Sequence, residues 1–130
     1  MPDPGSNSPS VPAPDDEPAG FFGAGLETCG RAEGPAHEAA TLIGTRSPIA
    51  LAVTLAAVRR AAALPTLEDV LVQEYRVSCA SLRSHDFVEG IRAQLVDKDR
   101  NPTWSPASLA GVTNADVDAY FTPADPDLTF

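Results

Sequence analysis

At 130 residues the chain has room for one domain but not comfortably for two, and its opening stretch offers little apolar surface to a core. Its net charge of −9 argues against a nucleic-acid partner, because binding a phosphate backbone requires a basic face. The acidity is unevenly placed: residues 1–34 hold six acids and one base, whereas residues 46–104 hold seven acids and eight bases. The middle of the chain can therefore face an anionic small molecule without general repulsion.

Cysteine usage and hydropathy exclude further classes. Cys29 and Cys79 lie 50 positions apart, and neither has a Cys or His nearby at metal-ligand spacing, so we expect free thiols and no metal site. No run of about 18 apolar residues occurs, and the amino terminus is rich in proline and acid where a secretory signal is basic and then apolar. These features predict a cytoplasmic protein without a membrane partner.

The first third of the chain carries few signals for regular structure. Residues 1–20 contain six prolines and little apolar surface, which predicts disorder. Residues 21–34 have four glycines and no sustained period, so we treat 1–34 together as a disordered or irregular stretch. Residues 35–44 predict a short helix with Pro35 in its first turn.

Two longer helices follow. Ser47 before Pro48 is typical of an N-cap, and the spacing predicts an inward face made of Leu51, Leu55, Val58 and Ala62. Thr66 starts the second helix with acids in its first turn, and the expected inward face is Leu67, Val70, Leu71, Tyr75, Ser78 and Leu82. We expect the two helices to pack through Leu51, Leu55, Leu71 and Tyr75, leaving a second apolar surface that includes Ile49, Val53, Val70 and Val77.

The last third predicts two short helices around a polar loop. Asp86 is read as the cap of a helix that carries Ile91 and Leu95. Residues 97–106 form a loop with two prolines and the only tryptophan, and a capped helix is expected over 113–121. Since no strand is predicted, the fold class is mainly α.

The order of these segments resembles the carboxyl end of the 3-hydroxyisobutyryl-CoA hydrolases of the crotonase superfamily. The matching sequence segments are SPIALAVTL, LEDVLVQEYRVS, HDFVEGIRAQLVDKDRNPTW, SPASLAGVT and the terminal DLTF. They run in family order from about Thr45 to Phe130, some two thirds of the chain. We therefore expect residues 35–130 to be the C-terminal helical region of such an α/β enzyme.

The resemblance implies an enzyme of valine catabolism that hydrolyses an acyl-CoA thioester. It places the oxyanion-binding amides and the acidic catalytic residues upstream of the matched segment. No catalytic residue of this chain can be assigned from it. CoA enters as part of the substrate, so no separate cofactor is expected.

Residues 84–89 invite catalytic or metal-binding interpretations that we do not favour. Ser84, His85 and Asp86 are consecutive, and a catalytic triad needs groups that converge from separate positions. His85 and Glu89 could share a helix face as a metal pair, but only two ligands are in view. Structural roles are the better interpretation, and Cys79 is better explained as a small buried residue than as a nucleophile.

Lys98, Arg100 and Trp104 are the candidate binding residues for the CoA moiety. In enzymes of the resembling family this part of the tail covers the adenine end of CoA. Lysine and arginine suit a phosphate, and an aromatic face suits a purine. The competing interpretation is a solvated loop anchored by a packed Trp104.

Two hypotheses of function follow from the sequence. The first is the C-terminal portion of an acyl-CoA hydrolase, inactive as an isolated chain. The second is a non-catalytic helical module for interaction or assembly, derived from the same family. The expected partners are an acyl-CoA substrate in the full-length enzyme and, through exposed apolar helix faces, a second copy of the chain.

Overall fold

The structure, a computed structural model, describes residues 18–31 and 33–130. Its helices are α1 (Pro18–Gly30), α2 (Pro35–Gly44), α3 (Pro48–Ala61), α4 (Leu67–Leu82), α5 (His85–Ile91) and α6 (Asn114–Asp118). The π-helical turn η1 (Arg92–Val96) continues α5, and the 3₁₀ turns η2 (Leu109–Gly111) and η3 (Ala119–Phe121) flank α6. The described residues contain no strand, so this part of the chain is mainly α, as predicted.

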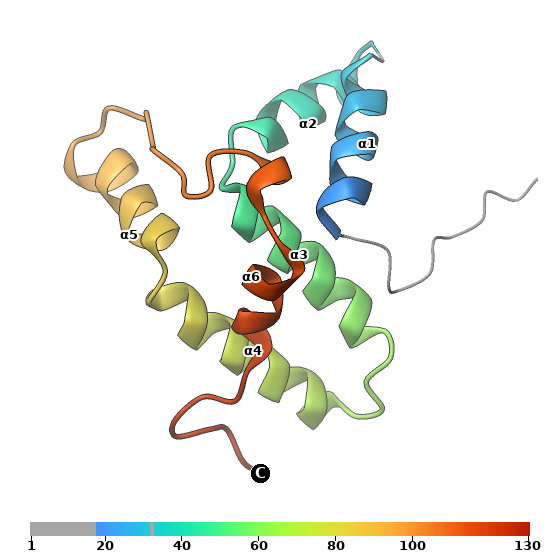
Figure 1. Cartoon of the computed structure of the whole chain (residues 1–130), viewed down its shortest axis with the longest axis vertical. Helices are drawn as coiled ribbons and strands as arrows, with labels where there is room; N and C mark the ends of the chain where they lie inside the picture. Colours follow the sequence, from blue (N-terminus) through green and yellow to red (C-terminus); the bar gives the residue numbers. More distant parts are fainter. Residues whose placement is uncertain (1–17, 32) are drawn as a thin grey trace, which may run out of the picture.

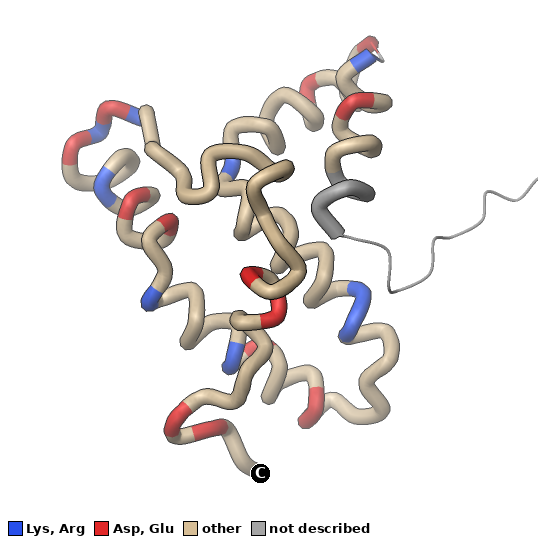
Figure 2. Tube along the Cα trace, in the orientation of Figure 1, with Lys and Arg blue, Asp and Glu red and all other residues tan. Residues whose placement is uncertain are grey.

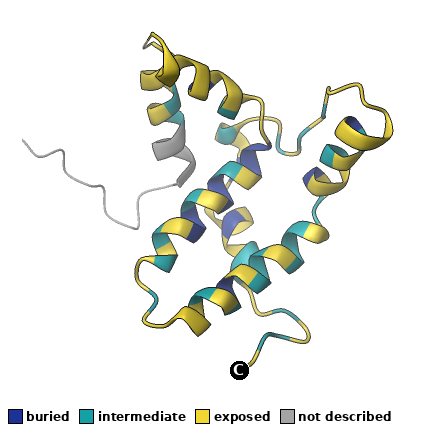
Figure 3. Ribbon diagram, turned by 180° about the vertical axis from the view of Figure 1, so that it is seen from behind, coloured by how far each residue is buried: buried dark blue, intermediate teal, exposed yellow. Residues whose placement is uncertain are grey.

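Helix α3 lies at the centre of the fold (Figure 1). Helices α1 and α2 lie at one end of it, and the C-terminal segment with α6 crosses it. Helix α4 turns back from the end of α3 and diverges from it toward α5, an arrangement that is also plain from behind (Figure 3). This divergence leaves α5 and the polar loop after it apart from the core.

The N-cap of α3 is the one predicted, but the buried face is not. The Ser47 hydroxyl accepts a hydrogen bond from the Ala50 amide at 3.2 Å, with Pro48 at the first helical position. The buried residues are those the sequence assigned to the exposed side, together with small alanines: Ile49, Ala52, Val53, Ala56 and Ala57. Val58 is 67% exposed. The error arises because the three buried alanines of α3 carry no strong periodic signal, yet they allow neighbouring segments to approach closely.

Helix α4 shows the same contrast between a predicted cap and a misassigned face. The Thr66 hydroxyl accepts from the Asp69 amide at 3.1 Å, which confirms the cap. Leu67 and Leu71 are exposed, whereas Gln73 is buried and donates to the Ala57 carbonyl of α3 at 3.0 Å. A polar side chain thus lies where the prediction placed leucines.

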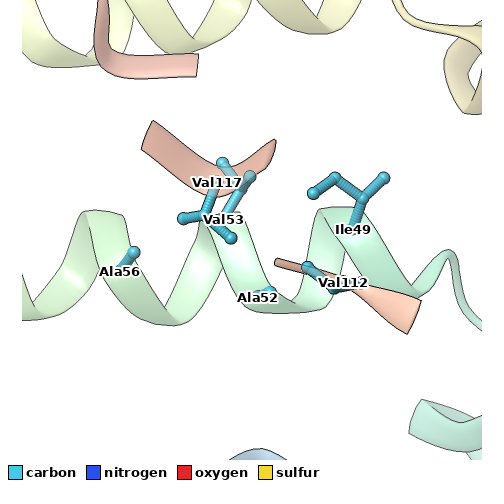
Figure 4. Packing of buried hydrophobic residues seen from close by; sticks show 6 residues of the cluster. All are labelled: Ile49, Ala52, Val53, Ala56, Val112 and Val117. Carbon is cyan, nitrogen blue, oxygen red and sulfur yellow. The ribbon is translucent and has the colours of Figure 1, made fainter. Parts of the chain in front are cut away.

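The core joins α3 to the last third of the chain. Ile49, Ala52, Val53 and Ala56 pack against Val112 and Val117 (Figure 4). Val117 lies on α6, which begins with a capping box between Thr113 and Asp116, so the helix predicted over 113–121 is confirmed in position and cap. Tyr120 and Phe121 pack on the edge of this cluster.

Helix α1 occupies part of the stretch that the sequence predicted to be irregular. It packs against α2, η2 and α3, and the ring of His37 on α2 lies 3.0 Å from the Gly30 carbonyl at its end. Tertiary contacts here outweigh the low helix propensity of its glycines. The predicted disorder of residues 1–17 lies outside the described residues.

The end of the chain is fixed to α4 by polar contacts. The guanidinium of Arg76 forms a fork with the carboxylate of Asp127, and the Tyr75 hydroxyl donates to the Pro126 carbonyl at 3.2 Å. The fork with Arg76 is the main cause that lowers the pKa of Asp127. Among the described residues no single helix is long and apolar enough to cross a membrane; α2 and α3 meet the test of length and composition only as a pair bent by 116°.

Replacing Val117 with alanine is expected to lower the free energy of unfolding by about 2 kcal/mol, because the side chain is 1% exposed and a cavity remains. Val58→Ala is the matched control, since this valine is 67% exposed and surface changes stay within about 0.5 kcal/mol. Urea unfolding followed by circular dichroism measures both. Equal losses in the two variants would contradict the assigned core.

Candidate functional site

A groove of about 880 Å³ lies between α3 and the unit formed by α4, α5 and η1. Its walls are mainly apolar and include Val53, Val58, Val77, Phe87, Ile91 and Leu95. Arg46, Arg100 and Trp104 also line it, and the last two come from the loop after η1. The groove therefore combines an apolar wall with two cations, an aromatic ring and the carboxylates of Glu74 and Asp86.

Helix α5 does not begin with the predicted cap. The cap is Ser84, whose hydroxyl accepts from the Phe87 amide at 3.2 Å. Asp86 is instead 6% exposed and accepts hydrogen bonds from the Ser47 hydroxyl, the Ser105 amide and the ring of His85. A buried carboxylate is costly unless it is fully hydrogen-bonded, which explains why three donors meet here.

A second carboxylate of α5 reaches the same loop. Glu89 lies three residues after Asp86, on the same helix face, and accepts from the Thr103 amide at 2.7 Å. Asp86 accepts from the Ser105 amide at 2.8 Å. The backbone on either side of Trp104 is thus held by two carboxylates of one helix.

Trp104 lies between these two anchors. Its indole nitrogen donates to the Thr45 carbonyl at 3.2 Å, and its ring lies against Gly90, where a Cβ atom would lie 3.6 Å from the ring. Trp104 is therefore packed as in the competing interpretation of the sequence, and the same residue lines the groove.

Arg92 organises the loop that precedes Trp104. Its guanidinium makes a two-bond fork with Glu89 at 2.8 Å and contacts Asp97 and Asp99 at 2.7 Å each. A further bond reaches the Asn101 carbonyl at 3.2 Å. Figure 2 shows this concentration of charge beside α5.

These contacts shift the titration of the groups involved. The fork with Arg92, followed by the Thr103 amide, lowers the pKa of Glu89 from 4.5 to about 2. The amide of Asn101 and the Arg92 guanidinium lower the pKa of Asp99, and the carboxylates together raise the pKa of Arg92. All of these groups are therefore charged near neutral pH.

The structure brings two of the three predicted binding residues together. Arg100 and Trp104 line the groove, whereas Lys98 is exposed and does not. Arg46 also lines the groove and was not predicted from the sequence. It directly follows Thr45, whose carbonyl accepts the hydrogen bond from the Trp104 indole. The sequence offered no periodic signal for an arginine in the turn before α3.

The interpretations rejected from the sequence are not supported by the geometry. The Ser84 hydroxyl contacts the Ser81 carbonyl and the Phe87 amide, and Asp86 lies between Ser47 and His85, an order that is not that of a triad. Within the described residues no group of three or more His, Cys, Asp or Glu side chains could hold a metal ion. Glu89 is engaged by Arg92 and Thr103.

Comparison with known proteins identifies the family. A family model described as enoyl-CoA hydratase/isomerase matches residues 24–121, about three quarters of the chain. The chain belongs to the enoyl-CoA hydratase/isomerase family. The match includes α2, α3, α4, α5 and α6 as well as the end of α1.

Curated relatives within this family are mitochondrial 3-hydroxyisobutyryl-CoA hydrolases. The mouse protein is 43% identical over 86 residues, the chicken protein 47% over 81 and the human protein 44% over 86. These alignments cover 66%, 62% and 66% of this chain but only 22%, 21% and 22% of the relatives. The chain therefore spans about a fifth of the length of the curated relatives it matches.

Two solved structures share the helical arrangement. A carnitinyl-CoA dehydratase from Mycobacterium thermoresistibile is 63% identical with a TM-score of 0.74, covering 88% of this chain and 32% of its own. An enoyl-CoA hydratase from Rhodobacter sphaeroides 2.4.1 is 32% identical with the same TM-score, covering 84% and 33%. The fold thus corresponds to about a third of larger enoyl-CoA hydratase/isomerase family proteins.

Glu89→Gln is expected to destabilise the chain at neutral pH, because an amide cannot form the charged fork with Arg92. Since the pKa of Glu89 is lowered from 4.5 to about 2, the carboxylate's contribution is complete above pH 4.5 and is lost as the pH falls toward 2. The difference between the urea midpoints of wild type and variant should shrink across that window. A difference that stays constant down to pH 2.5 would contradict the role of the fork.

The groove is expected to bind a hydrophobic dye such as anilinonaphthalene sulfonate, because its wall exposes Phe87, Ile91 and Leu95. Leu95→Glu should reduce the dye fluorescence. Leu67→Glu introduces the same charge at a leucine of nearly equal exposure, 69% against 68%, that does not line the groove. Equal reductions in both variants would show that the dye does not report the groove.

Proposed function

We propose that this chain is the C-terminal helical portion of an enzyme that hydrolyses acyl-CoA thioesters, and that its groove faces the CoA moiety. The observation that carries the proposal is the meeting of Arg46, Arg100 and Trp104 at one groove. A guanidinium can bind a phosphate through two parallel hydrogen bonds, and an indole face can stack on a purine. These are the two groups that an acyl-CoA presents at its nucleotide end.

The names of the relatives support recognition of CoA more strongly than any one reaction. They describe hydrolysis, dehydration and hydration, and each name contains a CoA ester. A feature shared by proteins that catalyse different reactions is suited to binding the part of the substrate that does not react, which here is the CoA moiety. Binding of that part contributes to catalysis only when it is coupled to stabilisation of the transition state elsewhere.

Hydrolysis is the preferred reaction because the curated relatives named for it match about two thirds of the chain at 43–47% identity. Dehydration is the second candidate, since the 63% identical structure carries that name. A role in valine catabolism goes with the first candidate. The expected cytoplasmic location stays a prediction, and the curated relatives are named mitochondrial.

The proposal predicts that the chain binds CoA, with Trp104 as the reporter because it is the only tryptophan. CoA should quench the fluorescence, and pantetheine, which lacks the nucleotide, should not. Arg100→Ala should weaken CoA binding about tenfold, as expected for one charged hydrogen-bonded contact. Arg83→Ala removes an exposed arginine that does not line the groove and should leave the affinity unchanged. Equal quenching by CoA and pantetheine would contradict the assignment.

The isolated chain is expected not to hydrolyse 3-hydroxyisobutyryl-CoA. Loss of one oxyanion donor costs about a hundred- to a thousandfold in rate, and the resemblance places both donors upstream of the matched segment. Release of free thiol, measured with a chromogenic disulfide, should equal the buffer blank. Turnover above the blank that a substitution in this chain abolishes would show that the chemistry lies within these residues.

A complementation experiment separates an enzyme segment from an assembly module. In the Mycobacterium thermoresistibile dehydratase, the matched third is replaced by this chain. Restored folding and activity on its own substrate support the role as an enzyme segment. A soluble chimera that stays inactive while the isolated chain forms a stable oligomer supports the module instead.

A further inference from the structure

The charges of residues 97–100 alternate, and the structure separates them by sign. The acids Asp97 and Asp99 both contact the Arg92 guanidinium at 2.7 Å. The bases between and after them, Lys98 and Arg100, form no ion pair among the described residues. Arg92 therefore neutralises the two carboxylates, and the side chains of Lys98 and Arg100 stay available to an anion.

The backbone of this loop adopts a conformation that L-residues rarely occupy. Lys98 has φ 57° and Arg100 has φ 54°, so both lie in the left-handed region. Such residues persist only where the surroundings compel them. Here the Arg100 amide donates to the Ala93 carbonyl at 3.0 Å, and Arg92 itself reaches the Asn101 carbonyl.

Arg92 also controls the far end of the loop through Glu89. The fork between them fixes the Glu89 carboxylate, which accepts from the Thr103 amide beside Trp104. One guanidinium thus contacts or holds the anchors at Asp97, Asp99, Asn101 and Thr103.

We propose that Arg92 is the positioning residue of the CoA-facing loop: by gathering Glu89, Asp97 and Asp99 on one side, it leaves Arg100 unpaired at the groove and holds Trp104 there. Its ligand rests on the proposed function, whereas its action on the loop does not. Arg92 itself does not contact the CoA phosphates, because its N–H groups already donate to Glu89 and to the loop.

The test uses endoproteinase Lys-C, because Lys98 is the only lysine of the chain and cleavage there reports opening of this loop alone. Arg92→Gln should increase the cleavage rate at least about tenfold, since cleavage follows the population of the opened loop. Arg92→Lys keeps the charge but not the fork and should give an intermediate rate. Asp99→Asn removes one contact on the exposed loop and should give a smaller increase without affecting the helices.

Arg76→Gln is the matched control. Arg76 lies on α4 and forms a comparable fork with Asp127, and its side chain is 29% exposed against 33% for that of Arg92. It should leave the cleavage rate at Lys98 unchanged when each variant is assayed the same number of degrees below its own thermal midpoint. A wild-type cleavage rate in both Arg92→Lys and Asp99→Asn would overturn the proposal. The same increase in Arg76→Gln would also overturn it, because the effect would then be global.

A second measurement links the loop to its ligand. In the Trp104 quenching assay, Arg92→Lys and Asp99→Asn should weaken CoA binding several-fold when each variant is assayed the same number of degrees below its own thermal midpoint. Unchanged CoA affinity in a variant whose loop has opened would overturn the positioning role. If wild-type chain does not bind CoA at all, the proposed function fails at this site, and the Lys-C rates alone decide what Arg92 does to the loop.

Discussion

The buried carboxylate of Asp86 is the joint on which the rest of the site depends. It accepts from Ser47 at the start of α3 and from the Ser105 amide of the loop, and it lies in the first turn of α5. Three segments distant in sequence therefore meet at one group. Because an unpaired buried carboxylate costs far more than a paired one, each donor constrains where its own segment can lie.

The contacts of Asp86 and its neighbours explain the spacing of residues in the HDFVEGIR motif. Asp86 and Glu89 face the loop together, the Trp104 ring lies on the helix at Gly90, and Arg92 gathers the acids that follow. A helix places residues three and four positions apart on one face, as Glu89 and Gly90 are from Asp86 and Arg92 is from Glu89, so one short motif can hold a loop that has almost no apolar content of its own. The motif and the loop are one structural unit.

The features predicted correctly from sequence were local, and those missed were not. The caps at Ser47, Thr66 and Thr113 depend on residues three positions apart and needed no knowledge of the fold. The buried faces of α3 and α4 depend on which segments pack there, and the prediction followed leucines where the structure uses alanines and Gln73. Asp86 was assigned to a cap because a partner 39 residues away has no signature in the sequence.

The orientation of α5 comes from these polar contacts rather than from burial of its apolar side chains. Phe87, Val88 and Ile91 are all exposed, so the helix contributes no large residue to the core around α3. Apolar contacts tolerate sliding, whereas hydrogen bonds to fixed backbone amides require one register. The carboxylates of α5 therefore set the position of Trp104, and the exposed apolar side chains of the same helix set one wall of the groove. Since both features belong to one rigid element, the aromatic ring and the apolar wall keep their relative position whatever the groove binds.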